Sequence, residues 1–378
     1  GAGKSRLAVQ TNGHPLSMSS LIGDSTGSVF LTNSSVLRGL NSSTSDGALM
    51  VEAVSVYVRD AVIDAVDMDI LDQGFVYFSE LGSTLGSPPA TYALDTLQVY
   101  EGGEAVVSYQ DPLLCGSNGS VVLLSVQNIT VQAGGAIHAD GQGCAGVLSA
   151  ALYDSSKEQS HGVGFGDVGS AGGGGGAHGG QGGDGFKGAG GVPYGSFTAP
   201  QLCGSGGGGG NSVSPVGGGE GGGVLYLSCT MLTLDGRLSA DGVVGDGSGG
   251  GGGAGGSVRV ETEFLNGTGT ISAVGGDGTF DSHAYGGGGS GGRVSLRVRR
   301  GETSFSGQVA AAGGESLQVD FVDVDRAFLR DMDTGLLEWL RSAGVRRAAS
   351  GTVYQETGAD GSAVTALSLD NIASFELN

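Results

Sequence analysis

The sequence predicts an all-β fold: a glycine-rich β-solenoid of the parallel β-helix type with a short C-terminal capping helix. Glycine accounts for 80 of the 378 residues, about three times its usual share. A motif of the form Gly-x-apolar-x-Ala-x-Gly occurs four times, and a segment of alternating apolar residues precedes each copy. Period-two segments that recur with a fixed motif are typical of stacked strands. An antiparallel β-sandwich with similar hairpins is the alternative fold.

The repeated motif predicts which side chains fill the core. The copies begin at positions 135, 236, 269 and 307, so the last three lie 33 and 38 residues apart. Because side chains alternate between the two faces of a strand, the third and fifth motif positions share one face. Stacking therefore predicts two inward columns and one outward column. The inward columns are Ile137, Leu238, Ile271 and Val309, and Ala139, Ala240, Ala273 and Ala311; the outward column is His138, Ser239, Ser272 and Ala310.

The N-terminal third differs in composition from the rest of the chain. Residues 1–110 contain several β-rich runs but few glycine pairs, and residues 51–58 alternate as a strand does. This region is either a set of early rungs or a separate β-domain, and the gradual change of composition favours early rungs. The glycine-rich solenoid is expected over residues 111–320, with a glycine-run insertion at about 145–220.

The C-terminal region, residues 321–378, departs from the repeat. Apolar residues recur there at spacings of three and four, which predicts a helix ending near Gly344. The open end of a solenoid exposes strand edges and core, so we expect the helix to cover it, with docking to another subunit as the alternative. Residues 351–378 return to strand-like alternation. The apolar positions are Phe328, Leu329, Met332, Leu336, Leu337 and Leu340.

Four glycine runs contain almost nothing but Gly, Ser and Ala. A free run is a flexible coil, whereas packed runs form extended threefold helices that bond to one another through the backbone. Several runs in one chain favour the packed form, because each run can bond the next. Such a surface lacks side-chain chemistry, which favours a structural role. The runs are residues 169–191, 204–223, 247–256 and 286–292.

Charge and hydropathy exclude some classes of partner. The chain has 17 Lys and Arg against 38 Asp and Glu, a formal net charge of −21. An acidic surface repels nucleic acid and anionic lipid, so we expect neither as a partner. No apolar stretch reaches the roughly 18 residues that a transmembrane helix needs.

Cysteines and glycosylation sequons both indicate an extracellular or cell-surface location. An even number of cysteines suits disulfide bonds, although sequence alone cannot select their pairing. Cys144 and Cys203 flank the glycine-run insertion, so we expect these two to close it. The Asn-x-Ser/Thr sequons are candidate glycan acceptors. The candidate disulfide cysteines are Cys115, Cys144, Cys203 and Cys229, and the candidate glycosylation sites are Asn33, Asn41, Asn118, Asn128 and Asn266.

From the sequence we predict no catalytic residues and no metal ligands. β-Helix enzymes that act on polysaccharides need clustered outward acids, and the outward column contains none. Residues 179–187 match one calcium-binding nonapeptide, but such sites draw ligands from consecutive copies. Calcium is therefore a weak candidate, and no other cofactor is expected. Asp140, Asp241 and Asp277 lie in repeat turns, where Asp normally accepts backbone hydrogen bonds.

Residues 119–315 resemble the glycine-rich repeats of secreted cell-surface proteins in plants, algae and oomycetes. The resemblance rests on glycine runs that lead into a strand, as in Gly-Gly-Arg293-Val294-Ser295-Leu296, paired with the segment Ile271-Ser-Ala-Val-Gly-Gly-Asp-Gly278. It implies an extracellular role at a wall or surface and transfers no catalytic residue.

Together these features predict a secreted, N-glycosylated structural subunit rather than an enzyme. The expected assembly is a surface filament, flagellar hair or matrix, built by self-association through strand edges and glycine-rich faces. The expected partners are copies of the chain itself, with other surface glycoproteins or polysaccharide as further candidates. A monomeric adhesin or carbohydrate-binding protein is the first alternative. A β-helix enzyme acting on polysaccharides is the second.

Overall fold

The computed structural model describes the chain in segments. These are residues 67–80, 90–109, 122–147, 161–169, 172–211, 215–247, 249–280, 284–300, 303–317 and 345–357, with shorter strand segments between residues 6 and 64 and between 363 and 376.

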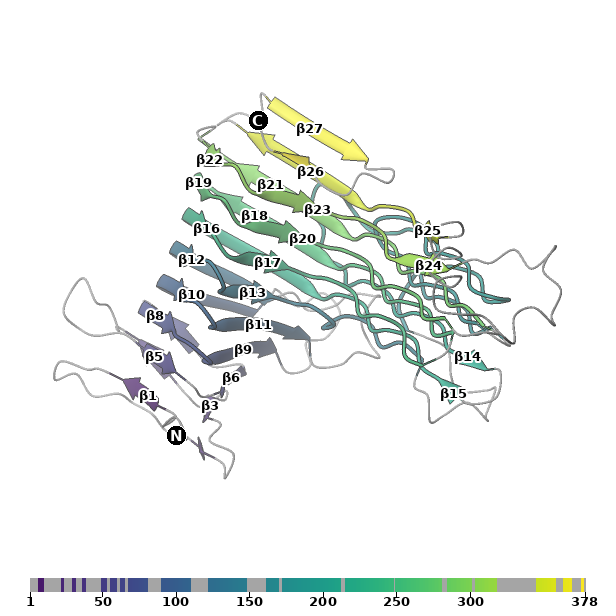
Figure 1. Ribbon diagram of the computed structural model, residues 1–378. Helices are drawn as coiled ribbons and strands as arrows, with labels where there is room; N and C mark the ends of the chain where they lie inside the picture. The colour runs from purple at the N-terminus through teal and green to yellow at the C-terminus, as the bar shows by residue number, and fades with distance from the viewer. Residues whose placement is uncertain are drawn as a thin grey trace.

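Two large sheets hold most of the strands (Figure 1). Sheet A has twelve strands and sheet B has ten. In order across the sheet, sheet A contains β1 (Arg6–Val9), β5 (Leu49–Glu52), β8 (Asp67–Ile70), β10 (Ala90–Val99), β12 (Val122–Val131), β16 (Val224–Leu234), β18 (Ser257–Thr262), β21 (Arg293–Val298), β26 (Thr352–Thr357) and β27 (Ala363–Ser368), with β19 (Phe264–Gly267) and β22 (Thr303–Phe305) off this path.

Sheet B receives the chain after most strands of sheet A. Tight turns such as residues 71–74 and 100–103 connect the two sheets. Its order is β2 (Ile22–Gly23), β3 (Val29–Leu31), β6 (Ser55–Arg59), β9 (Phe75–Glu80), β11 (Glu104–Tyr109), β13 (Ala136–His138), β17 (Arg237–Ser239), β20 (Thr270–Ser272), β23 (Gln308–Ala310) and β28 (Phe375–Glu376).

Three two-stranded sheets lie outside the main pair. They are β4 (Val36–Arg38) with β7 (Val62–Asp64), β14 (Gly210–Asn211) with β15 (Pro215–Val216), and β24 (Glu315–Leu317) with β25 (Val345–Arg347).

Neighbouring strands in the interior of both large sheets are parallel, from β8 to β26 in sheet A and from β3 to β23 in sheet B. Antiparallel pairing occurs at the ends, in the pairs β1–β5, β2–β3, β26–β27 and β23–β28. Strands from residues 1–110 and from residues 111–320 belong to the same two sheets.

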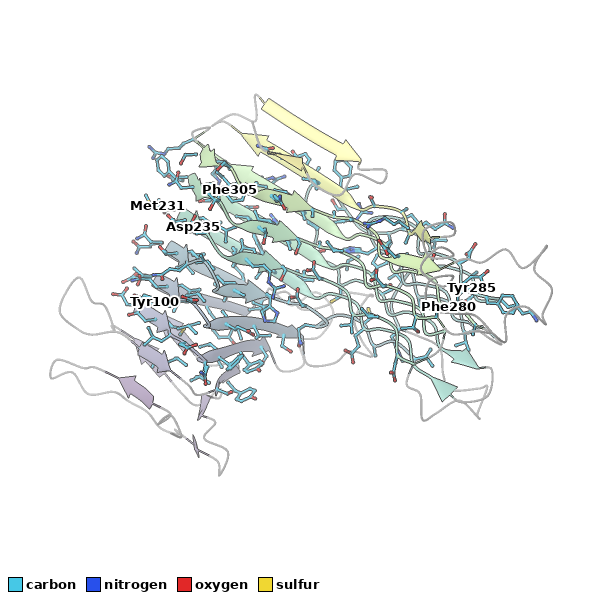
Figure 2. The ribbon with its side chains drawn as sticks, viewed as in Figure 1. Tyr100, Met231, Asp235, Phe280, Tyr285 and Phe305 are labelled. Atoms are coloured by element: carbon cyan, nitrogen blue, oxygen red, sulfur yellow. The ribbon has the colours of Figure 1, made fainter. Side chains whose placement is uncertain are left out.

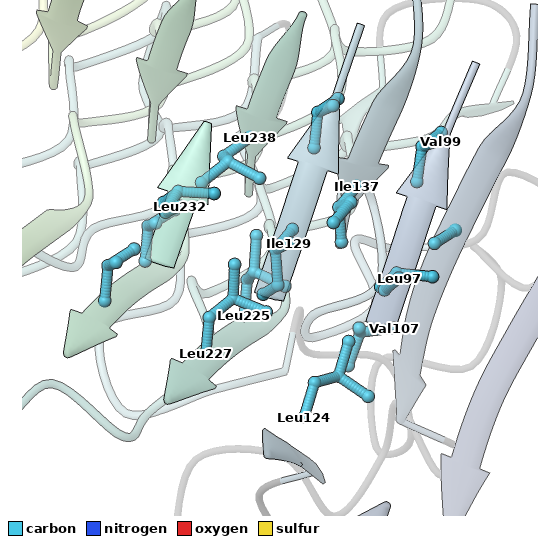
Figure 3. Packing of buried hydrophobic residues seen from close by; sticks show 14 of the residues in the cluster. Leu97, Val99, Val107, Leu124, Ile129, Ile137, Leu225, Leu227, Leu232 and Leu238 are labelled. Atoms are coloured by element: carbon cyan, nitrogen blue, oxygen red, sulfur yellow. The ribbon is translucent and has the colours of Figure 1, made fainter. Parts of the chain in front are cut away.

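The core lies between the two sheets, and the predicted inward columns are confirmed. Ile137, Leu238, Ile271 and Val309 are in register on successive strands, and each is completely buried. The four alanines of the narrower column are also completely buried. Sheet A supplies the facing layer, in which Leu97, Ile129 and Leu232 pack from neighbouring strands (Figure 3).

The predicted closed β-solenoid is wrong. The described residues form two open parallel sheets, and the long segments that return the chain from sheet B to sheet A are glycine-rich and carry almost no strand. Glycine has low β-propensity and no side chain to pack, so these segments do not complete a third β-face. The alternative antiparallel β-sandwich is also wrong, because the interior pairings are parallel. The described residues contain no helix, and the predicted capping helix falls at residues outside them.

The glycine runs pack into a bundle of extended threads beside the sheets (Figure 1). In residues 251–256, successive N–H groups donate to three different neighbouring threads, and the same three threads recur three residues later. The bonds of 2.7–2.9 Å run Gly251→Gly208, Gly252→Gly287 and Gly253→Val243, then Ala254→Ser205, Gly255→Ser290 and Gly256→Ala240. A neighbour that returns every third residue is the property of a threefold extended helix. The prediction of packed glycine runs is therefore confirmed.

The threads approach one another at backbone contact distance. A Cβ added at Gly253 would overlap the carbonyl oxygen of Glu220, and one added at Gly175 would overlap that of Gly288. Glycine is needed at these positions because the backbones of neighbouring threads approach too closely for a side chain.

An aromatic pair lies at the far end of the bundle, where Figure 2 labels Tyr285. Its ring packs edge-on against Phe186, with the ring centroids 5.6 Å apart.

We predict that Gly253→Ala destabilises the fold far more than Gly183→Ala. The new methyl group at position 253 would overlap the backbone of a neighbouring thread. That thread cannot move away without breaking its hydrogen bonds to other threads. We expect a loss of about 3 kcal/mol, the upper end of typical overpacking. At Gly183 the nearest atom to an added Cβ is 3.0 Å away, so about 1 kcal/mol or less is expected. Urea unfolding midpoints measure both, and equal midpoints would contradict the packed-thread geometry.

Candidate functional site

An aligned bulge crosses the outer face of sheet A. Leu94 pairs with Val126 and Thr96 with Asn128, and the residues between them are left out of the register. The same gap in the register recurs between β12 and β16, where Gln127 and Thr230 are skipped. At the equivalent position, Glu263 separates β18 from β19. A bulge turns two consecutive side chains to one face and bends the strand. The bulge column consists of Asp95, Gln127, Thr230 and Glu263.

A polar groove follows this bulge column. It has a volume of about 410 Å³ and crosses β10, β12, β16 and β18, which are consecutive in sheet A. We call it the sheet A groove. The polar side chains that matter for its chemistry are Asp95, Gln127, Thr230, Glu261, Glu263 and Arg299.

The charged side chains of the sheet A groove are paired within the protein. Glu261 accepts a 2.6 Å bond from Arg259 and lies 3.3 Å from Arg299. Burial raises the pKa of Glu261, but the bond from Arg259 and the neighbouring arginines outweigh it and lower the pKa overall. Glu263 pairs with Arg300 at 2.9 Å.

Gln127 completes the pairing in the groove. Its Nε2 donates to Asp95 Oδ1 at 2.9 Å, across neighbouring strands. Glu261 and Glu263 are thus ion-paired with arginines, whereas Asp95 accepts a hydrogen bond from a neutral amide.

Two of the predicted glycosylation sites lie in sheet A. Asn128 is exposed in β12, directly after Gln127 of the groove. Asn266 is half-buried in β19, and its Oδ1 accepts a 2.6 Å bond from Ser304. Asn33, Asn41 and Asn118 lie outside the described residues.

The predicted pairing of Cys144 with Cys203 is wrong. Cys144 is disulfide-bonded, whereas Cys203 and Cys229 carry free thiols, and Cys115 lies outside the described residues. Cys144 and Cys203 still share one small buried cluster with Val224. Burial raises the pKa of the Cys203 thiol to about 12, so this thiol is protonated at neutral pH.

The turn aspartates act as hydrogen-bond acceptors, as the sequence predicts. Asp140 accepts from the Asp241 N–H at 2.8 Å, Asp241 from the Val274 N–H at 2.7 Å, and Asp277 from the Glu315 N–H at 2.7 Å. Each carboxylate thus ties one repeat to the next. In the calcium-like segment, Asp184 Oδ1 accepts from the Gly190 N–H at 2.9 Å. No group of three or more His, Cys, Asp or Glu in the described part of the chain is placed to hold a metal.

A buried polar cluster joins the thread bundle to sheet A. Arg293, at the start of β21, is only 7% exposed and donates to the Tyr194 carbonyl at 2.6 and 3.0 Å and to Thr352 Oγ1 at 3.0 Å. His178 is completely buried, and its Nδ1 lies 3.0 Å from the Gly255 carbonyl oxygen. Its Nε2 has no hydrogen-bond partner among the described residues.

The cluster also fixes a segment that crosses sheet A. Residues 194–203 lie over the starts of its strands, where Ser257 Oγ donates to the Leu202 carbonyl at 2.7 Å and Ser295 Oγ to the Thr198 carbonyl at 3.0 Å. Sequence reasoning missed this role of His178 and Arg293. The signal for this role was an arginine at the first position of a strand, Arg293. The neighbouring strands have the small residues Ser257 and Thr352 at the same position.

We predict that His178 makes the fold less stable in acid. Burial, and secondly the charge of Arg293, lower the pKa of His178 to about 4 from 6.5. Between these two values the unfolded chain binds a proton that the folded chain does not. The free energy of unfolding therefore falls as pH falls from about 6.5 to 4, by on the order of 3 kcal/mol, and this penalty is absent above pH 7.

Urea unfolding of the protein and of His178→Asn between pH 7 and 4 measures the effect. The asparagine keeps an N–H donor but does not titrate. As pH falls, the unfolding free energy of the protein with His178 should decrease more than that of His178→Asn. Parallel pH curves would show that His178 does not contribute.

Comparison with protein-family models, with curated proteins and with solved structures found no match for this chain. Within the described residues, no helix is long and apolar enough to cross a membrane.

Proposed function

We propose that the protein is a secreted, N-glycosylated structural subunit of an extracellular assembly, built by association of copies through strand edges and glycine-rich faces. The observation that carries the proposal is the thread bundle. In long parts of the chain, backbone groups form hydrogen bonds with the backbone of other threads. The threads lie so close together that no side chain would fit between them. Such a bundle supplies shape and stiffness rather than reactive groups.

The end strands of sheet A support assembly in a line. Among the described strands, β1 and β27 are the last in the order of sheet A and lie at opposite ends of it (Figure 1). An end strand has one edge of N–H and C=O groups that no neighbouring strand of its sheet bonds. A contact between two different edges is repeated from copy to copy, and it generates a filament when the rotation between copies does not close a ring.

The exposed sequon at Asn128 supports the glycosylated, extracellular part of the proposal. Its side chain is open to solvent on the outer face of sheet A. A glycan attached there would extend away from the core and leave both end strands accessible.

We predict filaments with an axial repeat of about 48 Å. The sheet A path contains ten strands, and pairing β27 with β1 of the next copy gives ten spacings of about 4.8 Å. Electron microscopy of the native protein, released without denaturant, measures the repeat. Single particles dispersed at all concentrations would overturn the proposal.

A pair of proline variants tests the β27 edge. In the antiparallel pair β26–β27, adjacent residues direct their N–H groups alternately toward and away from the partner strand. Of Thr365→Pro and Ala366→Pro, one therefore removes an outward donor and the other an inward one. The outward variant should block filaments at an unchanged unfolding midpoint, and the inward variant should lower the midpoint. Filaments of normal length from both variants would exclude this edge.

A further inference from the structure

We infer that the sheet A groove binds a segment of an extended, uncharged polysaccharide. The site does not depend on the self-association proposed above. Its volume of about 410 Å³ falls within the roughly 300–1,000 Å³ of small-molecule sites. Three features of the groove define the ligand: its direction across the strands, its paired charges and its apolar rim.

The direction of the groove gives it a repeat. Because it crosses four consecutive parallel strands, equivalent side chains recur at the interstrand spacing of about 4.8 Å, over about 14 Å in all. A pyranose unit in an extended chain advances by a similar length. Successive sugar rings therefore meet successive members of the bulge column.

The charges of the groove select an uncharged ligand. Asp95 bonds Gln127, Glu261 bonds Arg259, and Glu263 bonds Arg300. An anionic polymer would have to displace Glu261 or Glu263 from its arginine, and it would face the carboxylate of Asp95. Hydroxyl groups instead use the remaining lone pairs and N–H groups, since carboxylates accept several bonds and an amide both donates and accepts.

An apolar rim suits the C–H faces of sugar rings. Met231 directly follows Thr230 of the bulge column, is 40% exposed, and pairs in register with half-buried Phe264, which follows Glu263 (Figure 2 labels Met231). The aromatic ring lies under the guanidinium of Arg300, 5.5 Å from its centroid. Beside Thr230 and Glu263 the rim is therefore apolar, whereas the equivalent positions beside Asp95 and Gln127 are the polar residues Thr96 and Asn128. One end of the groove thus offers an apolar contact to a sugar ring and the other end offers hydrogen bonds.

Calorimetric titration of the dispersed protein with cellohexaose, an uncharged linear glucose chain, tests the inference. The background is Asn128→Gln, so that no glycan stands beside the groove. We expect saturable binding that Gln127→Ala or Thr230→Val each weakens about five- to tenfold through one lost hydrogen bond. The matched control is Thr233→Val, which lies on the same strand beyond the groove and should bind normally. Oligogalacturonate of equal length should bind more weakly.

Three results would overturn the inference. They are absence of saturable binding, equal affinity for cellohexaose in the groove variants and the control, and tighter binding of the charged chain. Filament formation is measured separately by microscopy on the same variants. Failure of the groove therefore leaves the structural proposal intact, and failure of assembly leaves the groove intact.

Discussion

The backbone hydrogen bond between glycine threads is the interaction on which the rest of the structure depends. An isolated glycine run is costly to order, because glycine loses more conformational freedom on folding than any other residue. Here each run offsets that cost by bonding several others at once, as residues 251–256 do with three neighbours. Since these threads return the chain from sheet B to β16, β18 and β21 of sheet A, the positions of these three strands follow from the bundle.

Side chains lock the bundle to the sheets at a few places. The guanidinium of Arg293 gathers carbonyl and hydroxyl oxygens from the crossing segment and from β26, without a carboxylate partner in the hydrogen bonds described. Buried arginine is tolerated there because several acceptors share its charge. Just after the ends of the sheet B strands, the turn aspartates tie repeat to repeat through backbone N–H groups. Stability is thus distributed along the stack rather than held in one centre.

The sequence predicted the parts of the fold that side-chain alternation controls. The columns at Ile137 and Ala139 followed from period two, and the turn aspartates from turn chemistry. The paths of the glycine runs did not, because residues without side chains carry no signal of which neighbour they contact, and this is why the solenoid prediction failed. The bulge did leave a signal: Leu94 and Leu97 are both buried yet three residues apart, which breaks the alternation.

The threefold repeat of the threads restricts how the chain can change in length. One added residue would rotate the remainder of a thread by a third of a turn and present every later N–H to the wrong neighbour. Three added residues return each later N–H to its original direction and only make the thread longer. Relatives of this protein should therefore differ in thread length by steps of three, while single insertions gather in the connections between threads.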